Sequence, residues 1–204
     1  MNMQNDRDPM LFSNSALNEY LIIALPYAEI NGEVKEFKRD FFKRYGSFCG
    51  QNSCAHIRLM SFFQTEEREP RVIECVQNVL REIKAFEVFL SGFEFDSVSR
   101  SVYIDVVNKQ SVADVYHQLR LSLFRQLVSL AFLNKHFVPK MHIGQDLSPL
   151  QFLHAVEDYQ SKAYSNNFRL MRLHLLKRQA PYTVWENLAA LPFARSENEM
   201  IGFC

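Results

Sequence analysis

Hydrophobic and polar positions divide the chain into short strands and amphipathic helices. The first element is an apolar run over residues 20–25 that ends at Pro26, a pattern typical of a buried strand because proline has no backbone N–H to donate. Between residues 29 and 45, apolar positions recur every three or four residues among charged ones, and Gly46 follows. This spacing predicts an amphipathic helix that ends at the glycine, with its basic residues on a solvated face.

The same alternation continues along the rest of the chain. Further strands are predicted at about residues 56–63, 86–90, 101–107, 141–144, 168–177 and 182–188, and further helices at about residues 70–84, 112–130 and 149–162. The order strand, helix, strand, helix, strand thus occurs twice, with one more strand at the end. The first copy covers about residues 18–96 and the second about 100–193, between an N-terminal arm (1–17) and a C-terminal tail (194–204).

Composition limits the partners that the protein can attract. Among 204 residues, 23 Lys and Arg balance 23 Asp and Glu, and 48% of the residues are hydrophobic. A chain without net charge has no long-range positive field to draw in nucleic acid or an anionic membrane. Any nucleic-acid partner must therefore be bound in a local cleft.

Features typical of exported or membrane proteins are not evident. No apolar run approaches the roughly 20 residues of a membrane-spanning helix, and the polar start lacks the layout of a signal peptide. The four cysteines are too sparse for a disulfide framework. We therefore expect a cytoplasmic protein with reduced thiols and no membrane partner.

A histidine stands near the start of the second strand in each copy: His56 in the first and His142 in the second. Because side chains alternate along a strand, His56 would share a face with Arg58. For the same reason, His142 would share a face with Gly144. Imidazole has a pKa of about 6.5, so two rings facing one groove can act as base and acid on a bound phosphodiester without a metal ion.

The two histidine segments resemble a known family. Cys-Ala-His-Ile-Arg-Leu (54–59) and Pro-Lys-Met-His-Ile-Gly (139–144) are similar to the paired motifs of the two-histidine (2H) phosphoesterases, in particular the bacterial 2′-5′ RNA ligases or cyclic phosphodiesterases. The resemblance covers about residues 20–190. It implies an α+β fold in which duplicated β-α-β-α-β lobes, with antiparallel sheets, surround a central cleft. Residues 18–193 would then form one bilobal domain, with one histidine from each lobe facing the cleft.

The resemblance also implies a reaction. It predicts a metal-independent phosphoesterase, without a cofactor, that acts on 2′,3′-cyclic phosphates or 2′-5′ linkages. Its partner would be a nucleotide or an RNA terminus that carries such a group, with His56 and His142 as the catalytic pair. The direction of the reaction, the acid or base role of each histidine and the oligomeric state stay open.

The chain departs from the family motif two residues after each histidine. There the family has a Thr or Ser whose hydroxyl would donate a hydrogen bond to a phosphoryl oxygen, and this chain has Arg58 and Gly144. The resemblance makes Arg58 and Gly144 the phosphate-binding positions. Arg58 can still bind phosphate through its forked guanidinium, whereas Gly144 has no side-chain donor, so a backbone amide, a water or Lys140 would have to replace the hydroxyl. Lys140, Tyr103 and Arg100 are candidates for the edge of the cleft.

Other interpretations are open at this stage. The chain could be a relative that has lost catalysis and binds a nucleotide or RNA end without turnover, or a fold retained for protein–protein contact. Cys49, Cys54 and His56 could begin a zinc site, although a structural site needs four ligands and no second cysteine pair follows. Arg58 could instead pair with a carboxylate at the rim.

Overall fold

The computed structural model describes residues 17–126, 131–132, 137–179 and 184–194. The predicted arm and tail lie almost wholly outside the described residues, and their boundaries stay a prediction. The elements are β1 (Leu17–Ala24), α1 (Ala28–Tyr45), β2 (Ile57–Thr65), the 3₁₀ turn η1 (Glu66–Arg68), α2 (Glu69–Arg81), β3 (Phe86–Asp96), β4 (Ser101–Val106), α3 (Lys109–Gln126), β5 (Ala131–Phe132), β6 (Lys140–Gly144), α4 (Pro149–Tyr159), β7 (Ser165–Leu170), β8 (Arg172–Gln179) and β9 (Glu186–Pro192).

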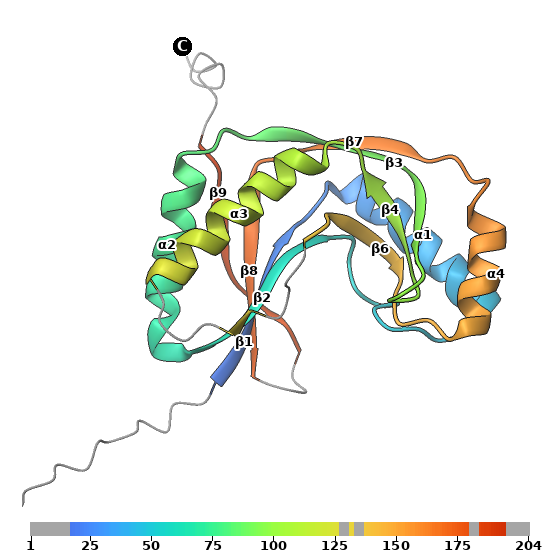
Figure 1. Cartoon of the computed structure of the whole chain (residues 1–204), viewed down its shortest axis with the longest axis horizontal. Coiled ribbons are helices and arrows are strands. Elements are labelled where there is room, and N and C mark those ends of the chain that lie inside the picture. Colours follow the sequence, from blue (N-terminus) through green and yellow to red (C-terminus); the bar gives the residue numbers. More distant parts are fainter. Residues whose placement is uncertain (1–16, 127–130, 133–136, 180–183, 195–204) are drawn as a thin grey trace, which may run out of the picture.

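All described strands pair antiparallel in one sheet with the order β7-β3-β4-β6-β2-β1-β8-β9, and β5 lies beside β2. The sheet narrows at its middle, where β2 and β6 are joined by the single pair Ile57 and Met141. It therefore consists of two half-sheets, β7-β3-β4-β6 and β2-β1-β8-β9, which curve apart as an arch (Figure 1). The predicted α+β class with antiparallel sheets is confirmed.

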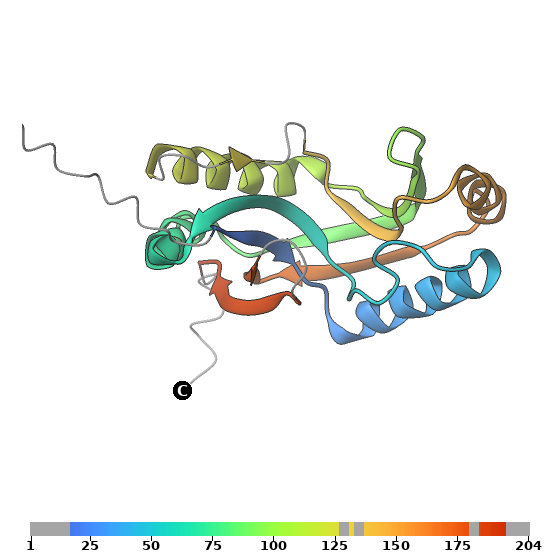
Figure 2. The same cartoon turned by 90° about the horizontal axis from the view of Figure 1, so that it is seen from below.

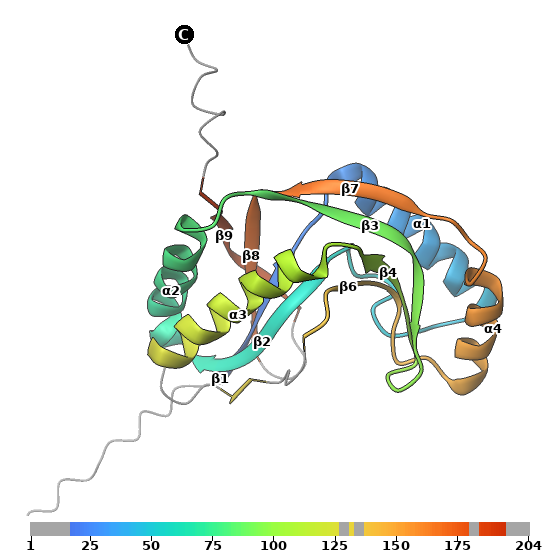
Figure 3. The ribbon, with the colours of Figure 1, turned by 45° about the horizontal axis from the view of Figure 1, so that its top comes forward.

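Each half-sheet carries two helices. Helices α1 and α4 pack on the half that contains β4 and β6, and α2 and α3 pack together on the half that contains β9. Figures 2 and 3 show these helix pairs at opposite ends of the molecule. Helix α1 of the first sequence copy thus covers β6 of the second. Each half of the structure combines elements from both copies, with its core between the half-sheet and its helices.

Two strand predictions differ from the structure. The predicted strand over 168–177 is two strands, β7 and β8, interrupted at Met171. β7 pairs with β3 at one edge of the sheet, and β8 pairs with β1 in the other half, so the chain crosses between the halves where apolar alternation continues. β3 also continues beyond Leu90 to Asp96, because Gly92 at a φ of 68° forms a bulge instead of ending the strand.

The described helices include none that is both long enough and apolar enough to cross a bilayer. The predicted last strand, 182–188, overlaps β9 only over residues 186–188: Val184 and Trp185 precede the strand, β9 continues to Pro192, and residues 182 and 183 lie outside the described residues. The same holds for the end of the helix predicted over 112–130: α3 is described to Gln126.

Candidate active site

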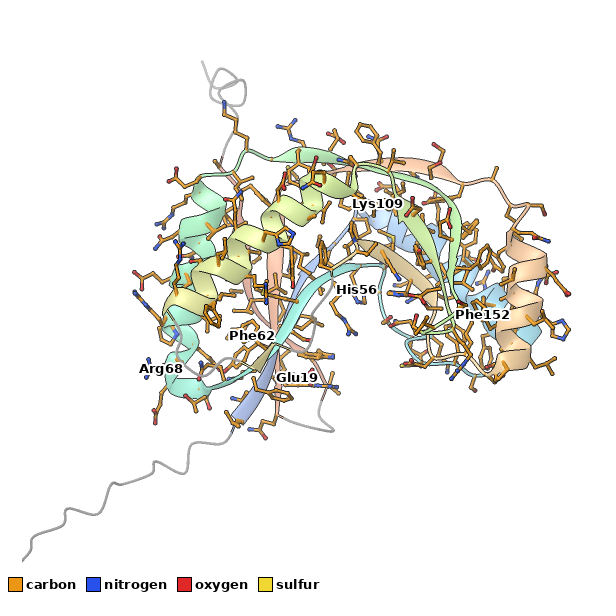
Figure 4. The ribbon with its side chains drawn as sticks, in the orientation of Figure 1. Glu19, His56, Phe62, Arg68, Lys109 and Phe152 are labelled. Carbon is orange, nitrogen blue, oxygen red and sulfur yellow. The ribbon has the colours of Figure 1, made fainter. Side chains whose placement is uncertain are left out.

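His56 is positioned by a loop that α1 holds in place. It lies one residue before β2, at the junction of the half-sheets (Figure 4). Its Nδ1 is 2.9 Å from the carbonyl oxygen of Cys54, so Nδ1–H donates to that oxygen and leaves Nε2 free for chemistry. From α1, Asn31 accepts a hydrogen bond from the backbone N–H of Ala55 at 2.9 Å.

Lys38 of α1 fixes the same loop. Its Nζ donates to the carbonyl oxygens of Gly50 (3.1 Å) and Ser53 (3.0 Å) and to the Ser53 hydroxyl (2.8 Å). The side chain has no carboxylate partner among these contacts, and burial lowers its pKa to about 8. The expectation of a solvated face is therefore wrong for Lys38, which is only 4% exposed.

His142 lies on β6 beside Tyr103 of β4, its partner across the ladder. The two rings meet edge to face with centroids 6.0 Å apart. Lys140, two residues before His142, places its Nζ 2.7 Å from the carboxylate of Asp96 and 4.6 Å from the centre of the Tyr103 ring. Lys140 is thus already held by an ion pair.

The register at the junction puts each histidine next to a paired residue, His56 before Ile57 and His142 after Met141. Ile57 pairs with Met141, and the next position of an antiparallel ladder would pair His56 with His142. Ile57 and Met141 are fully buried, so their neighbours face the other, open side of the sheet. A positive charge on His56 is among the charges that lower the pKa of His142.

Two cavities adjoin this junction. The polar cavity, of about 360 Å³, is lined by Arg58, Asp96, Ser99, Phe137, Val138, Lys140, His142 and Gln145. The apolar cavity, of about 540 Å³, contains His56 and is lined by Leu21, Ile23, Cys49, Gly50, Asn52, Ser53, Cys54, Arg58, Gln145, Leu176, Val184 and Trp185. Each histidine therefore borders a cavity, and the two cavities share a wall of Arg58 and Gln145.

Cations and burial keep both imidazoles neutral in the free cleft. Burial lowers the pKa of His142 to about 3, with further contributions from Lys140 and Arg58. Burial also lowers the pKa of His56, and Lys38 and Arg58 add to the effect. A cleft with several cations and neutral imidazoles favours an anionic ligand.

Arg58 is exposed on β2 and borders both cavities. Within the described part of the chain, its guanidinium has no ion pair or hydrogen bond. A rim carboxylate that would occupy it is therefore not found among these residues. The guanidinium is available to an anion at the junction.

The expectation that Gly144 shares a face with His142 is wrong. Tyr103 pairs with His142 while the adjacent Val102 pairs with Gly144, so β6 carries one extra residue, Ile143, as a bulge. Val102 is fully buried, and residues directly opposite in a ladder face the same side. Gly144 consequently faces the core and offers phosphate no side-chain position.

The contacts around Gly144 predict how much a side chain at this position would lower the stability of the fold. A Cβ at Gly144 would lie 3.0 Å from Cζ of the buried Phe41 and 3.4 Å from Leu147. We expect Gly144→Ala to destabilise the fold by about 1–3 kcal/mol through overpacking, measured by urea denaturation. The matched control is Gly32→Ala in α1, where nothing lies within 4 Å, and an unchanged or higher stability is expected. Equal stability of wild type and Gly144→Ala would contradict this packing.

The remaining candidates lie as follows. Tyr103 contacts His142, whereas Arg100 lines neither cavity. Arg100 adopts a φ of 44° in the β3–β4 turn, and its Nε donates to the Leu147 carbonyl oxygen at 2.6 Å, so it holds a loop instead of the cleft edge. Among the described residues, no three His, Cys, Asp or Glu side chains gather as a metal site, the Cys49, Cys54 and His56 set included.

Sequence reasoning missed Gln145 and Asp96. Gln145 follows the second motif, and only the bulge at Ile143 shows that it, not Gly144, is aligned with the open face. Asp96 ends β3 and reaches the cleft through its contact with Lys140. Neither position carries a periodic or motif signal in one sequence.

The sequence of the chain decides its family. The profile of the 2′-5′ RNA ligase superfamily matches residues 26–181. The chain belongs to this superfamily. The family resemblance drawn from the His56 and His142 segments is thereby confirmed. No curated protein sequence matches this member significantly.

Solved structures share the fold of this superfamily member. TT0787 of Thermus thermophilus has a TM-score of 0.67 and 12% identity, and the match covers 88% of this chain and 100% of that one. E. coli LigT in its apo form has a TM-score of 0.62 and 14% identity over 88% and 99% of the two chains. The MHV ns2 PDE domain has a TM-score of 0.52 and 12% identity over 78% and 99%. LigT has also been crystallised with 3′-AMP, ATP and NADP+.

Proposed function

We propose that this protein is a phosphoesterase that opens nucleoside 2′,3′-cyclic phosphates, or cleaves 2′-5′ linkages in RNA or nucleotides, without a metal ion. The observation that supports the proposal is the pair Ile57 and Met141 at the junction, because continuing this register would set His56 opposite His142 on the open side of the sheet beside Arg58. The nucleotide complexes of LigT support a nucleotide as ligand for this fold.

The chemistry follows from the two imidazoles. For a cyclic phosphate, one neutral imidazole takes a proton from water as the water oxygen bonds to phosphorus. The other, protonated, gives a proton to the ribose oxygen as its bond to phosphorus breaks. Arg58 would bind the non-bridging oxygens. Which histidine is the base depends on the direction of the reaction.

We assign the rest of the nucleotide to the apolar cavity. Leu21, Ile23, Leu176 and Trp185 line it on the His56 side of the junction. A base and ribose can bury their apolar surface there while the phosphate stays at the shared wall. The polar cavity on the other side would receive water or a second ribose.

The lowered pKa values predict how the reaction depends on pH. Both rings are neutral at pH 7 in the free protein, but the negative charge of a bound phosphodiester favours imidazolium and raises both pKa values. Because kcat/KM reports the free enzyme and kcat the complex, we expect the optimum of kcat/KM below about pH 6.5 and that of kcat at higher pH.

The test measures turnover of nucleoside 2′,3′-cyclic phosphates between pH 4 and 9, with and without EDTA. We expect turnover that EDTA leaves unchanged and bell-shaped profiles displaced from each other as described. Activity that disappears with EDTA, or superimposable profiles of kcat and kcat/KM, would overturn this mechanism.

A second candidate function rests on Gly144. Without a donor there, the protein could bind a nucleotide or RNA end and release it unchanged. Saturable binding of 3′-AMP by calorimetry, together with no turnover of any cyclic phosphate, would favour this alternative.

A further inference from the structure

We propose that the Gln145 carboxamide binds the phosphoryl group, donating the hydrogen bond that the family hydroxyl would supply at position 144. This inference deepens the proposed function and rests on it.

The bulge at Ile143 changes which residue after His142 faces the open side of the sheet. It turns Gly144 toward Phe41 in the core. Alternation then returns the next residue, Gln145, to the open face occupied by His142. The position of the motif donor is therefore displaced by one residue along the chain, to Gln145 directly after β6, and its side chain is able to donate.

The backbone of Gln145 is tied to the other histidine segment. Gln145 forms an antiparallel bridge with Cys49, in the loop that leads to His56. Its Nε2 lies above Gly50, where an added Cβ would approach to 3.1 Å. Because Gly50, at a φ of 78°, has no Cβ, the carboxamide of Gln145 has space to lie there.

Gln145 lies where a phosphate bound between the two imidazole rings would be expected. Of the described residues, Arg58 and Gln145 are the two that line both cavities, while His142 borders one and His56 the other. A phosphorus atom within reach of both imidazoles would lie at this shared wall. The carboxamide can donate two hydrogen bonds to its oxygens.

The competing donor is already engaged. The Lys140 ammonium is 2.7 Å from Asp96 and packs over the ring of Tyr103. No described residue forms a hydrogen bond with the Gln145 side chain. A neutral amide also stabilises charge on phosphate without lowering the pKa of the histidines further, unlike another cation.

The test compares Gln145→Ala and Gln145→Glu with wild type, and Gln118→Ala on the exposed face of α3 serves as matched control. We expect kcat on nucleoside 2′,3′-cyclic phosphate to fall about 10²–10³-fold in both Gln145 variants, with a smaller change in KM. For Gln145→Ala the pH profile and the thermal midpoint should stay as in wild type, because a donor to phosphate does not position the histidines. Gln118→Ala should match wild type throughout.

Two results overturn the inference while leaving the proposed function standing: wild-type kcat in Gln145→Ala, or a loss of activity in that variant accompanied by a shifted pH profile. If wild type has no turnover, the proposed function fails, and 3′-AMP binding by calorimetry decides on Gln145. Weaker binding by at least tenfold in Gln145→Ala supports it, and equal or absent binding in both proteins refutes it.

Discussion

Replacing His142 by alanine is expected to lower kcat/KM on nucleoside 2′,3′-cyclic phosphates by about 10²–10⁴-fold, and replacing His56 should have a similar effect. Each ring supplies one of the two proton transfers, and a positioned acid or base contributes a factor of this size. The double variant should lose little beyond the worse single one, because groups that act together are not additive. Initial rates at the pH optimum of wild type provide the measurement.

The matched control for the histidines is His154→Ala. His154 lies on α4, its side chain is 52% exposed, and it contacts Glu157 away from both cavities. The His154→Ala variant should retain wild-type rates. The thermal midpoints of all variants show whether each still folds. Turnover that persists in both His56→Ala and His142→Ala, with folding intact, would show that the pair does not carry the reaction.

The order and type of most elements could be predicted from the sequence because each reflects local periodicity. The helix over 29–45 and the strand over 101–107 follow directly from the spacing of buried side chains, and both agree with α1 and β4 to within a residue or so. The family could also be predicted from the sequence, by the resemblance of the two segments around His56 and His142 to its motifs, and the superfamily profile matches residues 26–181.

Errors arose where long-range packing decides the conformation. The break at Met171 is invisible in a single sequence, because apolar residues alternate on both sides of it while β7 and β8 pair in different halves. Lys38 follows the pattern of a solvated helix face, yet the loop at Gly50 and Ser53 folds over it and supplies three acceptors.

The largest error in the predicted site comes from the bulge on β6. Alternation predicts one face for His142 and Gly144, and an extra residue in the ladder reverses that assignment. A sequence pattern does not encode a bulge, because its position depends on how β4 and β6 pair. The bulge is accompanied by the packing of Phe41 against Gly144 in the core. The spacing of residues along the sequence does not reveal this contact.

Arg58→Ala is expected to reduce kcat/KM by about 10²–10³-fold, since it removes a charged donor to the phosphate at the wall between the two cavities. Arg58→Lys keeps the charge but not the forked geometry, so it should recover only part of this loss. The same substitutions have a second readout. Arg58 is one of the groups that lower the pKa of both histidines.

Removing that charge should therefore raise the pKa of His56 and His142, and Arg58→Lys should leave both close to wild type. Titration of the imidazole protons by NMR measures the shifts, with His154 as an internal reference because it borders neither cavity. An Arg58→Ala protein with wild-type KM and unshifted histidines would mean that the guanidinium points away from the junction. The phosphate would then have to be held by Gln145 and the imidazoles alone.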